Sequence, residues 1–325
     1  MTDSAIAVDL GGTNIRAALV DRNGQIGPVV SRHTGAPEGP DAVIDRMVAL
    51  VSEVVNTAQP GPETMVGVVA PGPLNPLTGV LHFGPNLPGW HDVPLRDILG
   101  RRLNRRVVIG NDANSAALGE LMFGAARQVR HLIYIALGTG VGGGIVSHGQ
   151  LIEGTRGVGG EVGHVSVDPF GPRCHCGGIG CIESYVGGWA IARDGEMLVR
   201  SGRSGAIEAA ARDGPITAEV VAEAARLGDA AARGIFQRAG QALGIGLGGL
   251  VNVFNPEMIV IGGGLAAVGD LLLDPVRENL PRYAMAQIYP DVTIRPSALG
   301  TNTGLFGAAA RVFYHEQSST SPVDE

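Results

Sequence analysis

The stretch Ala5–Gly24, AIAVDLGGTNIRAALVDRNG, contains the pattern that decides the fold of this 325-residue chain. Its first six residues are mostly apolar and are followed by glycine, which is typical of a buried strand. The glycine-rich turn Gly11–Asn14 leads into a second apolar run at Ile15–Val20, so we expect a hairpin. The backbone N–H groups and the hydroxyl at its tip can hold an anion, although turns of this composition are often only turns.

The same plan occurs again at Tyr134–Gly154, YIALGTGVGGGIVSHGQLIEG, where a Gly-Thr-Gly turn separates two apolar runs. A third glycine turn, Ile261–Gly264, follows the apolar run Met258–Ile261. This repetition predicts two structurally duplicated α/β halves. We expect the first two turns to hold the phosphates of a nucleotide and the third to lie near its base.

The three cysteines of the chain, Cys174, Cys176 and Cys181, lie within eight positions of one another. With His164, ten positions upstream, they form a Cys₃His set of the soft and borderline ligands that zinc prefers. His175 is an alternative nitrogen ligand, but its neighbours would have to contort for it to join them, so we favour His164. A disulfide would leave one thiol unpaired, and no feature of the sequence indicates an oxidising compartment.

Composition excludes several classes of function. A chain of 325 residues exceeds the usual size of one domain, so we expect two. The net charge of −7 gives no electrostatic footprint for nucleic acid, and no apolar run approaches the roughly 18 residues of a membrane span. Without a visible signal peptide, we expect a soluble cytoplasmic protein. All 24 basic residues are arginine, which excludes a lysine Schiff base and a P-loop lysine.

Two polar positions outside the glycine turns are candidate site residues. Asp112 follows a predicted strand at 106–110 and precedes a predicted helix at 113–123, where α/β enzymes place catalytic groups. An aspartate at that position is also a common helix cap. Asn86 lies in the proline-rich segment 71–90, which is too long for a plain connection. That segment either presents Asn86 to a polar ligand or forms a rigid surface flap.

Three predicted helices can be compared with the structure. The first, 41–58, is amphipathic and is expected to have Asp41 as its N-cap. The second, 229–254, carries Gly240, Gly244, Gly246, Gly248 and Gly249, which cost helix stability and are expected to allow close packing against neighbouring backbone. The third, 303–315, is the final amphipathic helix, and we expect 317–325 to be a frayed polar tail.

In combination, the motifs resemble those of the ROK family, the sugar kinases and related repressors of the actin-like, hexokinase-like superfamily. They are DLGGTN at 9–14, ND at 111–112, LGTGVGGG at 137–144, GEVGH at 160–164 and CHCGGIGCIE at 174–183, and PNLPGW at 85–90 resembles the glucokinase branch. The resemblance implies two actin-like (ribonuclease H-like) α/β domains with a cleft between them. We expect a smaller domain at 1–115, joined by the helix 303–317, and a larger domain at 116–302 with the zinc motif at 164–181.

The resemblance also implies ATP-dependent phosphorylation of a hexose, with glucose as the first candidate. Asp112 would be the general base, and Asp9 would orient Mg²⁺ through water. The residues implied to hold the sugar are Asn86, Asn111, Asp112, Glu161, His164 and Glu183. Those implied to hold ATP, besides Asp9, are Gly11, Gly12, Thr13, Asn14, Thr139, Gly140, Gly262 and Gly263. The closed Cys₃His site would be structural, with the second ring nitrogen of His164 facing a sugar hydroxyl.

Several alternatives stay open. The sugar could be fructose, mannose, allose, N-acetylmannosamine or N-acetylglucosamine, and polyphosphate could replace ATP. A sugar-responsive repressor would carry a helix-turn-helix segment before the first glycine turn, and Asp9 leaves no room for it. A non-catalytic sugar-binding regulator would need neither Asp112 as a base nor Asp9 as a magnesium anchor. The expected partners are the sugar and ATP, with neither nucleic acid nor membrane, and we expect a homodimer or a dimer of dimers.

Overall fold

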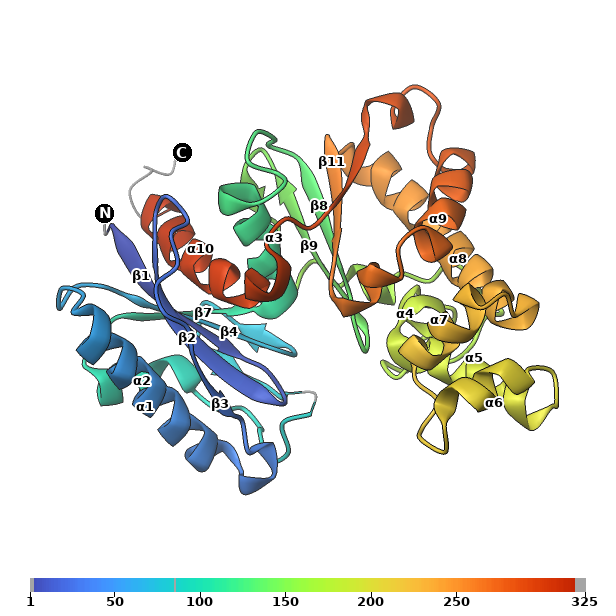
Figure 1. Ribbon diagram of the computed structural model, residues 1–325. Coiled ribbons are helices and arrows are strands. Elements are labelled where there is room, and N and C mark those ends of the chain that lie inside the picture. The colour runs from blue at the N-terminus through green and yellow to red at the C-terminus, as the bar shows by residue number, and fades with distance from the viewer. Residues whose placement is uncertain (1–2, 85, 319–325) are drawn as a thin grey trace. The chain divides into compact units, whose positions relative to one another are not determined.

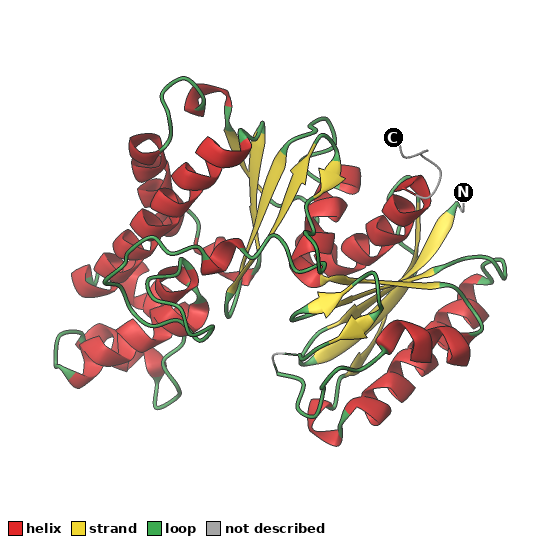
Figure 2. Cartoon of the chain, turned by 180° about the vertical axis from the view of Figure 1, so that it is seen from behind, coloured by secondary structure: helices red, strands yellow, loops and turns green. Residues whose placement is uncertain are grey.

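The computed structural model describes residues 3–84 and 86–318, and the chain divides into two compact units. The first unit comprises Met1–Val129, Gly144–Gly160 and Ser297–Glu325, and the second comprises Arg130–Gly143 and Glu161–Pro296. Pro85 of the PNLPGW motif and most of the predicted tail at 317–325 lie outside the described residues. Figures 1 and 2 trace the strands and helices of both units. No helix in the described part of the chain is both long and apolar enough to cross a bilayer.

The sheet of the first unit has five strands in the order β3-β2-β1-β4-β7. Its members are β1 (Ser4–Leu10), β2 (Asn14–Asp21), β3 (Val30–His33), β4 (Val66–Ala70) and β7 (Val107–Asn111). β1 and β2 pair antiparallel from Ser4↔Asp21 to Leu10↔Ile15, which confirms the predicted hairpin. β4 lies parallel to β1, and β7 lies parallel to β4. The carboxyl ends of these three strands therefore meet at one edge of the sheet.

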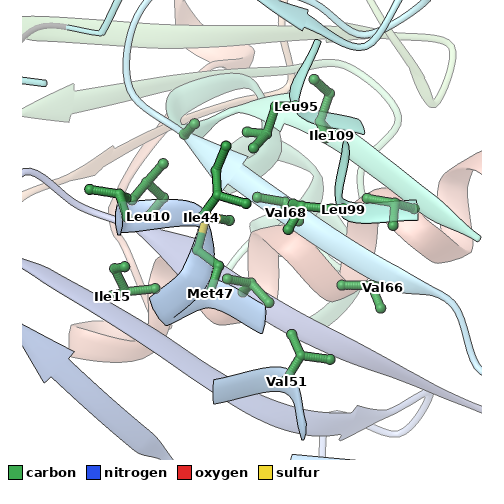
Figure 3. Packing of buried hydrophobic residues seen from close by; sticks show 14 of the residues in the cluster. Leu10, Ile15, Ile44, Met47, Val51, Val66, Val68, Leu95, Leu99 and Ile109 are labelled. Carbon is green, nitrogen blue, oxygen red and sulfur yellow. The ribbon is translucent and has the colours of Figure 1, made fainter. Parts of the chain in front are cut away.

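Alternate residues of β1 face two different helical layers. Ile6, Val8 and Leu10 pack with α1 (Pro40–Ala58) and α2 (Leu95–Leu103), and Figure 3 shows this cluster around Met47. The small side chains of Ala5 and Ala7 face α10 (Thr303–Ser318), which lies beside α3 (Asp112–Phe123) on the other side of the sheet (Figure 1). Each fully buried aliphatic side chain contributes about 1.5–3 kcal/mol to the stability of this sandwich.

The predicted N-cap of α1 is wrong. Gly39 occupies the cap position, and Asp41 lies in the first turn of the helix. Pro40 has a backbone angle that suits the first helical position, so the helix begins one residue earlier than expected. Asp41 still favours the helix start, because a carboxylate in the first turn interacts well with the helix dipole.

Short elements complete the first unit. The segment 71–90, expected as a long loop, contains a small antiparallel pair, β5 (Leu74–Asn75) and β6 (Val80–Leu81). The other short elements are η1 (Ala36–Glu38), β10 (Gln150–Leu151) and η5 (Gly300–Asn302).

The second sheet has the strand order β10-β9-β8-β11-β12. β8 (Leu132–Leu137) and β9 (Val141–Ser147) flank the second glycine turn, as predicted. β11 (Met258–Gly262) lies parallel to both β8 and β12 (Thr293–Pro296). The boundary between the two units falls within β9, between Gly143 and Gly144.

The second unit is otherwise mainly helical. Its elements are η2 (Val162–His164), α4 (Glu183–Val186), α5 (Gly188–Arg200), α6 (Gly205–Ala211), α7 (Ala218–Arg226), α8 (Ala230–Phe254), η3 (Gly264–Val268), α9 (Asp270–Tyr283) and η4 (Tyr289–Asp291). α8 packs along α9 (Figure 1). A Cβ on Gly240 would lie 2.6 Å from the carbonyl oxygen of Leu272, and one on Gly248 would lie 2.6 Å from the Cβ of Tyr283. These contacts confirm that glycines of α8 allow close packing.

Candidate functional site

The strand ends of the first unit bring several predicted residues to the same edge of the sheet. Asp9 pairs with Val69, and Ala70, the next residue, pairs with Asn111. Asp9, Asn111 and Asp112 therefore lie together where parallel strands end, which is the usual place for the ligands of an α/β enzyme.

Asp9 carries a half-buried carboxylate to which no described residue donates a hydrogen bond. Arg16, its cross-strand neighbour, directs its guanidinium to Thr301 and Asn302 instead. Burial raises the pKa of Asp9 above its ordinary value, and the charge of Arg16 only partly opposes this. A Cβ on Gly304 would lie 2.4 Å from the carboxylate, so glycine leaves the room that the carboxylate occupies. Such a group fits a cation held directly or through water.

Thr34 holds the first glycine turn through hydrogen bonds, and the sequence did not predict this role. The buried Thr34 hydroxyl donates to the carbonyl of Gly11 at 2.7 Å, and its backbone N–H donates to the carbonyl of Thr13 at 2.7 Å. The Thr13 side chain is left exposed. Asn86 lies against the same turn, because a Cβ on Gly12 would be 3.1 Å from the Asn86 Cβ. The structure therefore brings Asn86 to the first turn.

The alternative that Asp112 caps α3 is wrong, because Asn111 is the N-cap. Its Oδ1 accepts from the backbone N–H groups of Ala113 and Asn114 at 3.0 and 3.1 Å. Its Nδ2 donates to the carbonyl of Gly72 at 3.3 Å. The predicted sugar contact of Asn111 is thus limited to its remaining N–H. Asp112 is exposed at the first position of the helix, where its Oδ1 accepts from Ala113 N at 2.8 Å.

In the second unit, His164, Cys174, Cys176 and Cys181 converge as predicted, with their ligand atoms all within 4.8 Å of one another. The Sγ atoms of Cys176 and Cys181 are 3.7 Å apart, as are Cys174 Sγ and His164 Nδ1. Zinc–sulfur bonds of 2.3 Å at tetrahedral angles place two sulfurs about 3.8 Å apart. The donor set therefore fits tetrahedral zinc, and none of the three cysteines forms a disulfide.

A glycine fixes the backbone of the metal-binding segment 164–181, and burial raises the pKa values of two of its thiols. Gly180 has a φ of +67°, and a Cβ there would lie 1.7 Å from the carbonyl oxygen of Asp168. Burial raises the pKa of Cys174 to about 12 and also raises that of Cys181, whereas a backbone N–H of Gly178 lowers the pKa of Cys176. The two buried thiols therefore need a cation to become thiolates at neutral pH.

His164 separates its two ring nitrogens as the resemblance implied. Nδ1 faces the Cys174 thiol, whereas Nε2 lies 3.9 Å from a carboxylate oxygen of Glu161. Burial raises the pKa of Glu161, an effect that His164 opposes and Glu183 reinforces. Glu161 and Glu183 therefore lie beside the metal ligands, to which His164 belongs. His175, the alternative ligand, instead stacks on Trp189.

Glu183 joins the metal segment to the second glycine turn. Its Oε2 accepts from Val141 N at 2.9 Å, and its Oε1 lies 3.6 Å from Cys174 Sγ. A Cβ on Gly140 would lie 2.4 Å from Oε2, so the turn fits closely over the carboxylate. The carboxylate that was expected to contact sugar is thus also an anchor for the turn.

A cavity of about 440 Å³ lies beside Thr139 of the second turn. α5 begins on this turn, since Gly188 N donates to Gly138 O at 2.9 Å and Trp189 N donates to Thr139 O at 3.2 Å. The cavity is lined by Gly138, Thr139, Gly188, Trp189, Ala192, Ile216, Thr217, Ala218, Glu219, Gly264 and Leu265. Gly263 is close by, because a Cβ there would be 2.2 Å from Leu137 O. The residues from α5 and α7 were missed, and no sequence motif marks them.

Comparisons with known proteins cover nearly the whole chain. The sequence profile of the ROK family matches residues 5–313. A glucokinase of Thermotoga maritima is 38% identical over 306 residues, which are 94% of this chain and 96% of that protein. The crystal structure of a ROK hexokinase from Thermus thermophilus has a TM-score of 0.85 and 32% identity, covering 97% of this chain and 99% of that one. A ROK family glucokinase from Streptomyces griseus, in complex with glucose and AMPPNP, has a TM-score of 0.78 and 34% identity, covering 94% and 98%.

Proposed function

Because this chain belongs to the ROK family, with the mixed α/β fold of its actin-like sugar kinases, we propose that it is an ATP-dependent glucokinase that produces glucose 6-phosphate. The predicted family and fold class are confirmed. Support for the sugar and the nucleotide comes from the Thermotoga glucokinase and from the Streptomyces enzyme bound to glucose and AMPPNP.

The observation that carries the proposal is the pair of carboxylates at the strand ends of the first unit. Asp112 is exposed, and the capping task at that helix start is performed by Asn111. Asp9 keeps a half-buried carboxylate that no described residue hydrogen-bonds. A protein that only binds sugar needs neither group, so the pair favours a kinase over a non-catalytic regulator.

Asp112 acts as the general base. Its carboxylate takes the proton of the sugar 6-hydroxyl as that oxygen bonds to the γ-phosphorus of ATP, and the bond from phosphorus to the β,γ-bridging oxygen breaks to release ADP. Proton loss occurs late in a loose phosphoryl transfer, so an ordinary carboxylate suffices. A well-placed general base contributes roughly 10²–10⁴-fold to the rate.

Asp9 would hold Mg²⁺, through water, and that ion would offset the charge of the phosphates. The chain contains no lysine, so its own phosphate contacts must come from backbone N–H groups, hydroxyls or arginine. Thr13 and Thr139 present exposed hydroxyls at the tips of the two turns. The phosphates are assigned to these turns, at Gly11–Asn14 and at Thr139 and Gly140.

The residues assigned to the sugar are Asn86, Asn111 and Asp112, together with Glu161, His164 and Glu183 of the metal-binding region. The Cys₃His ligands leave no open position for chemistry, so zinc there would be structural. It would fix the ring of His164 through Nδ1, which leaves Nε2 on the side of Glu161.

The test is a coupled ADP-release assay with Mg²⁺-ATP or polyphosphate and a panel of glucose, fructose, mannose, allose and N-acetylhexosamines. Asp112→Asn should lower turnover on the preferred sugar by roughly 10²–10⁴-fold while sugar binding persists. Asp97→Asn, on the exposed part of α2, is the matched control and should retain activity. Sugar binding without ADP release would support the regulator instead, and full activity of Asp112→Asn would refute the assigned base.

A further inference from the structure

His175 lies between two metal ligands but is not one of them. The Cys₃His set is completed by His164, and the His175 ring instead stacks on the Trp189 indole. The ring centroids are 4.0 Å apart and the planes are inclined by 22°. The flanking residues Cys174 and Cys176 are both donors of the metal site. The conformation of the loop that carries these donors therefore determines where His175 lies.

Trp189 lies beside the second glycine turn of the same unit, which is assigned to the phosphates. It lies in the first turn of α5, and its backbone N–H donates to Thr139 O at 3.2 Å. Trp189 lines the 440 Å³ cavity beside the second glycine turn. The Cζ atom of Arg193, also in α5, lies 5.3 Å from the centre of the indole. Trp189 therefore contacts His175 of the metal-binding loop and also lines the cavity.

We propose that His175 is a positioning residue for the nucleotide: it fixes the Trp189 wall of the cavity and so makes ATP binding depend on the order of the metal-ligand loop. The inference rests on the proposed function, because the occupant of the cavity is the ATP of that reaction. It assigns the metal segment a second task besides holding Glu161, His164 and Glu183. An aromatic stack of this kind corresponds to roughly a 2- to 10-fold change in affinity.

Trp189 itself reports on the cavity, because the chain contains only two tryptophans. The other, Trp90, is buried in the first unit, and its ring N–H has no hydrogen-bond partner among the described residues. Trp90→Phe therefore leaves a single fluorophore at the proposed site without removing a hydrogen bond. We expect Mg²⁺-ATP, added without sugar, to change the Trp189 emission.

The decisive variants are His175→Ala, which removes the stack, and His175→Phe, which keeps an aromatic ring. His175→Ala should weaken Mg²⁺-ATP binding and raise the KM for ATP by about 2- to 10-fold, with kcat and the KM for glucose changed less than twofold. His175→Phe should restore both values. His91→Ala, an exposed histidine of the first unit, is the matched control. Metal content, measured by elemental analysis, should be equal in all variants.

The outcomes separate this inference from the proposed function. If the parent protein binds no ATP, the proposed function fails. If it binds ATP and His175→Ala binds it equally well, this inference alone is overturned. Loss of metal from His175→Ala, or an equal rise in both KM values, would show a general structural role and would also overturn it. Metal chelation should weaken ATP binding in the parent protein more than in His175→Ala, and an equal effect in both contradicts the coupling.

Discussion

The two glycine turns have the same plan in sequence but different supports in the structure. At the first, the Thr34 hydroxyl donates to the Gly11 carbonyl, and Asp9 is the last residue but one of the preceding strand. Behind the second, Glu183 accepts from Val141 N, and α5 begins on the turn. When Leu10 is aligned with Leu137, the position of Asp9 is occupied by Ala136. The duplicated plan therefore carries a carboxylate in the strand before the first turn, whereas the second turn is held by a carboxylate from a later segment.

This difference teaches that a glycine turn alone does not determine a role. Both turns offer backbone N–H groups and a threonine hydroxyl, and both suit phosphate. Apart from Asp9, the groups that make them different come from more distant parts of the chain. Variants of those groups should therefore affect one turn and spare the other.

The largest effect is expected from Asp9→Asn, which keeps the shape of the side chain and removes its charge. Turnover should fall roughly 100-fold, equivalent to about 3 kcal/mol of lost charge stabilisation by the magnesium ion. The assay is initial rate against Mg²⁺ concentration, with circular dichroism to verify folding. Turnover within threefold of the parent would contradict the proposed role of the Asp9 charge, which distinguishes the first turn from the second.

Of the two glycine turns, only the second should be affected by loss of the metal. Cys181→Ser should abolish zinc binding and lower turnover by roughly 10- to 100-fold, because Glu161, His164 and Glu183 lose their fixed positions. Hydrogen exchange should accelerate in 138–143 and remain unchanged in 11–14. Full activity in a zinc-free, folded variant would show that the metal does not order the site.

Glu183→Ala should free the second turn by removing the acceptor for Val141 N. A hydrogen bond to a charged group contributes about 1.5–3 kcal/mol, so exchange of that amide should accelerate roughly 10- to 100-fold. Hydrogen-exchange mass spectrometry of the peptide that contains Val141 measures this directly. Unchanged protection would mean that α5 alone holds the turn.

The smallest effect is expected from Thr34→Val, which removes the hydroxyl that donates to Gly11 O. The lost hydrogen bond corresponds to about 0.5–1.5 kcal/mol, and the KM for ATP should rise accordingly by roughly 2- to 10-fold. Thr34→Ser retains the hydroxyl and should behave like the parent. If valine and serine gave the same KM, the hydroxyl would have no part in holding the turn.

The sequence predicted the features that arise from local pattern. The hairpins of β1–β2 and β8–β9 follow from apolar runs interrupted by glycine, and the cysteine spacing predicted a metal site with the correct histidine. The sequence did not predict the residues that hold the first turn in place or line the cavity. Thr34 and Trp189 have no special local context, and their roles depend on contacts made after the chain has folded. The sequence left open whether Asp112 caps α3, because adjacent Asn111 and Asp112 can both cap a helix, and the backbone geometry selects Asn111.

The packing of α10 on β1 has a consequence for biosynthesis. Ala5 and Ala7 precede the residues that cover their face of the sheet, Leu305, Ala308 and Val312, by about 300 positions in the chain. At about 5–20 residues per second, that face waits roughly 15 to 60 seconds for its cover. Most of the second unit, at 161–296, emerges before that cover is made. This apolar face of the sheet therefore stays uncovered while the residues between β1 and α10 are synthesised, and nascent-chain chaperones have that interval in which to bind it.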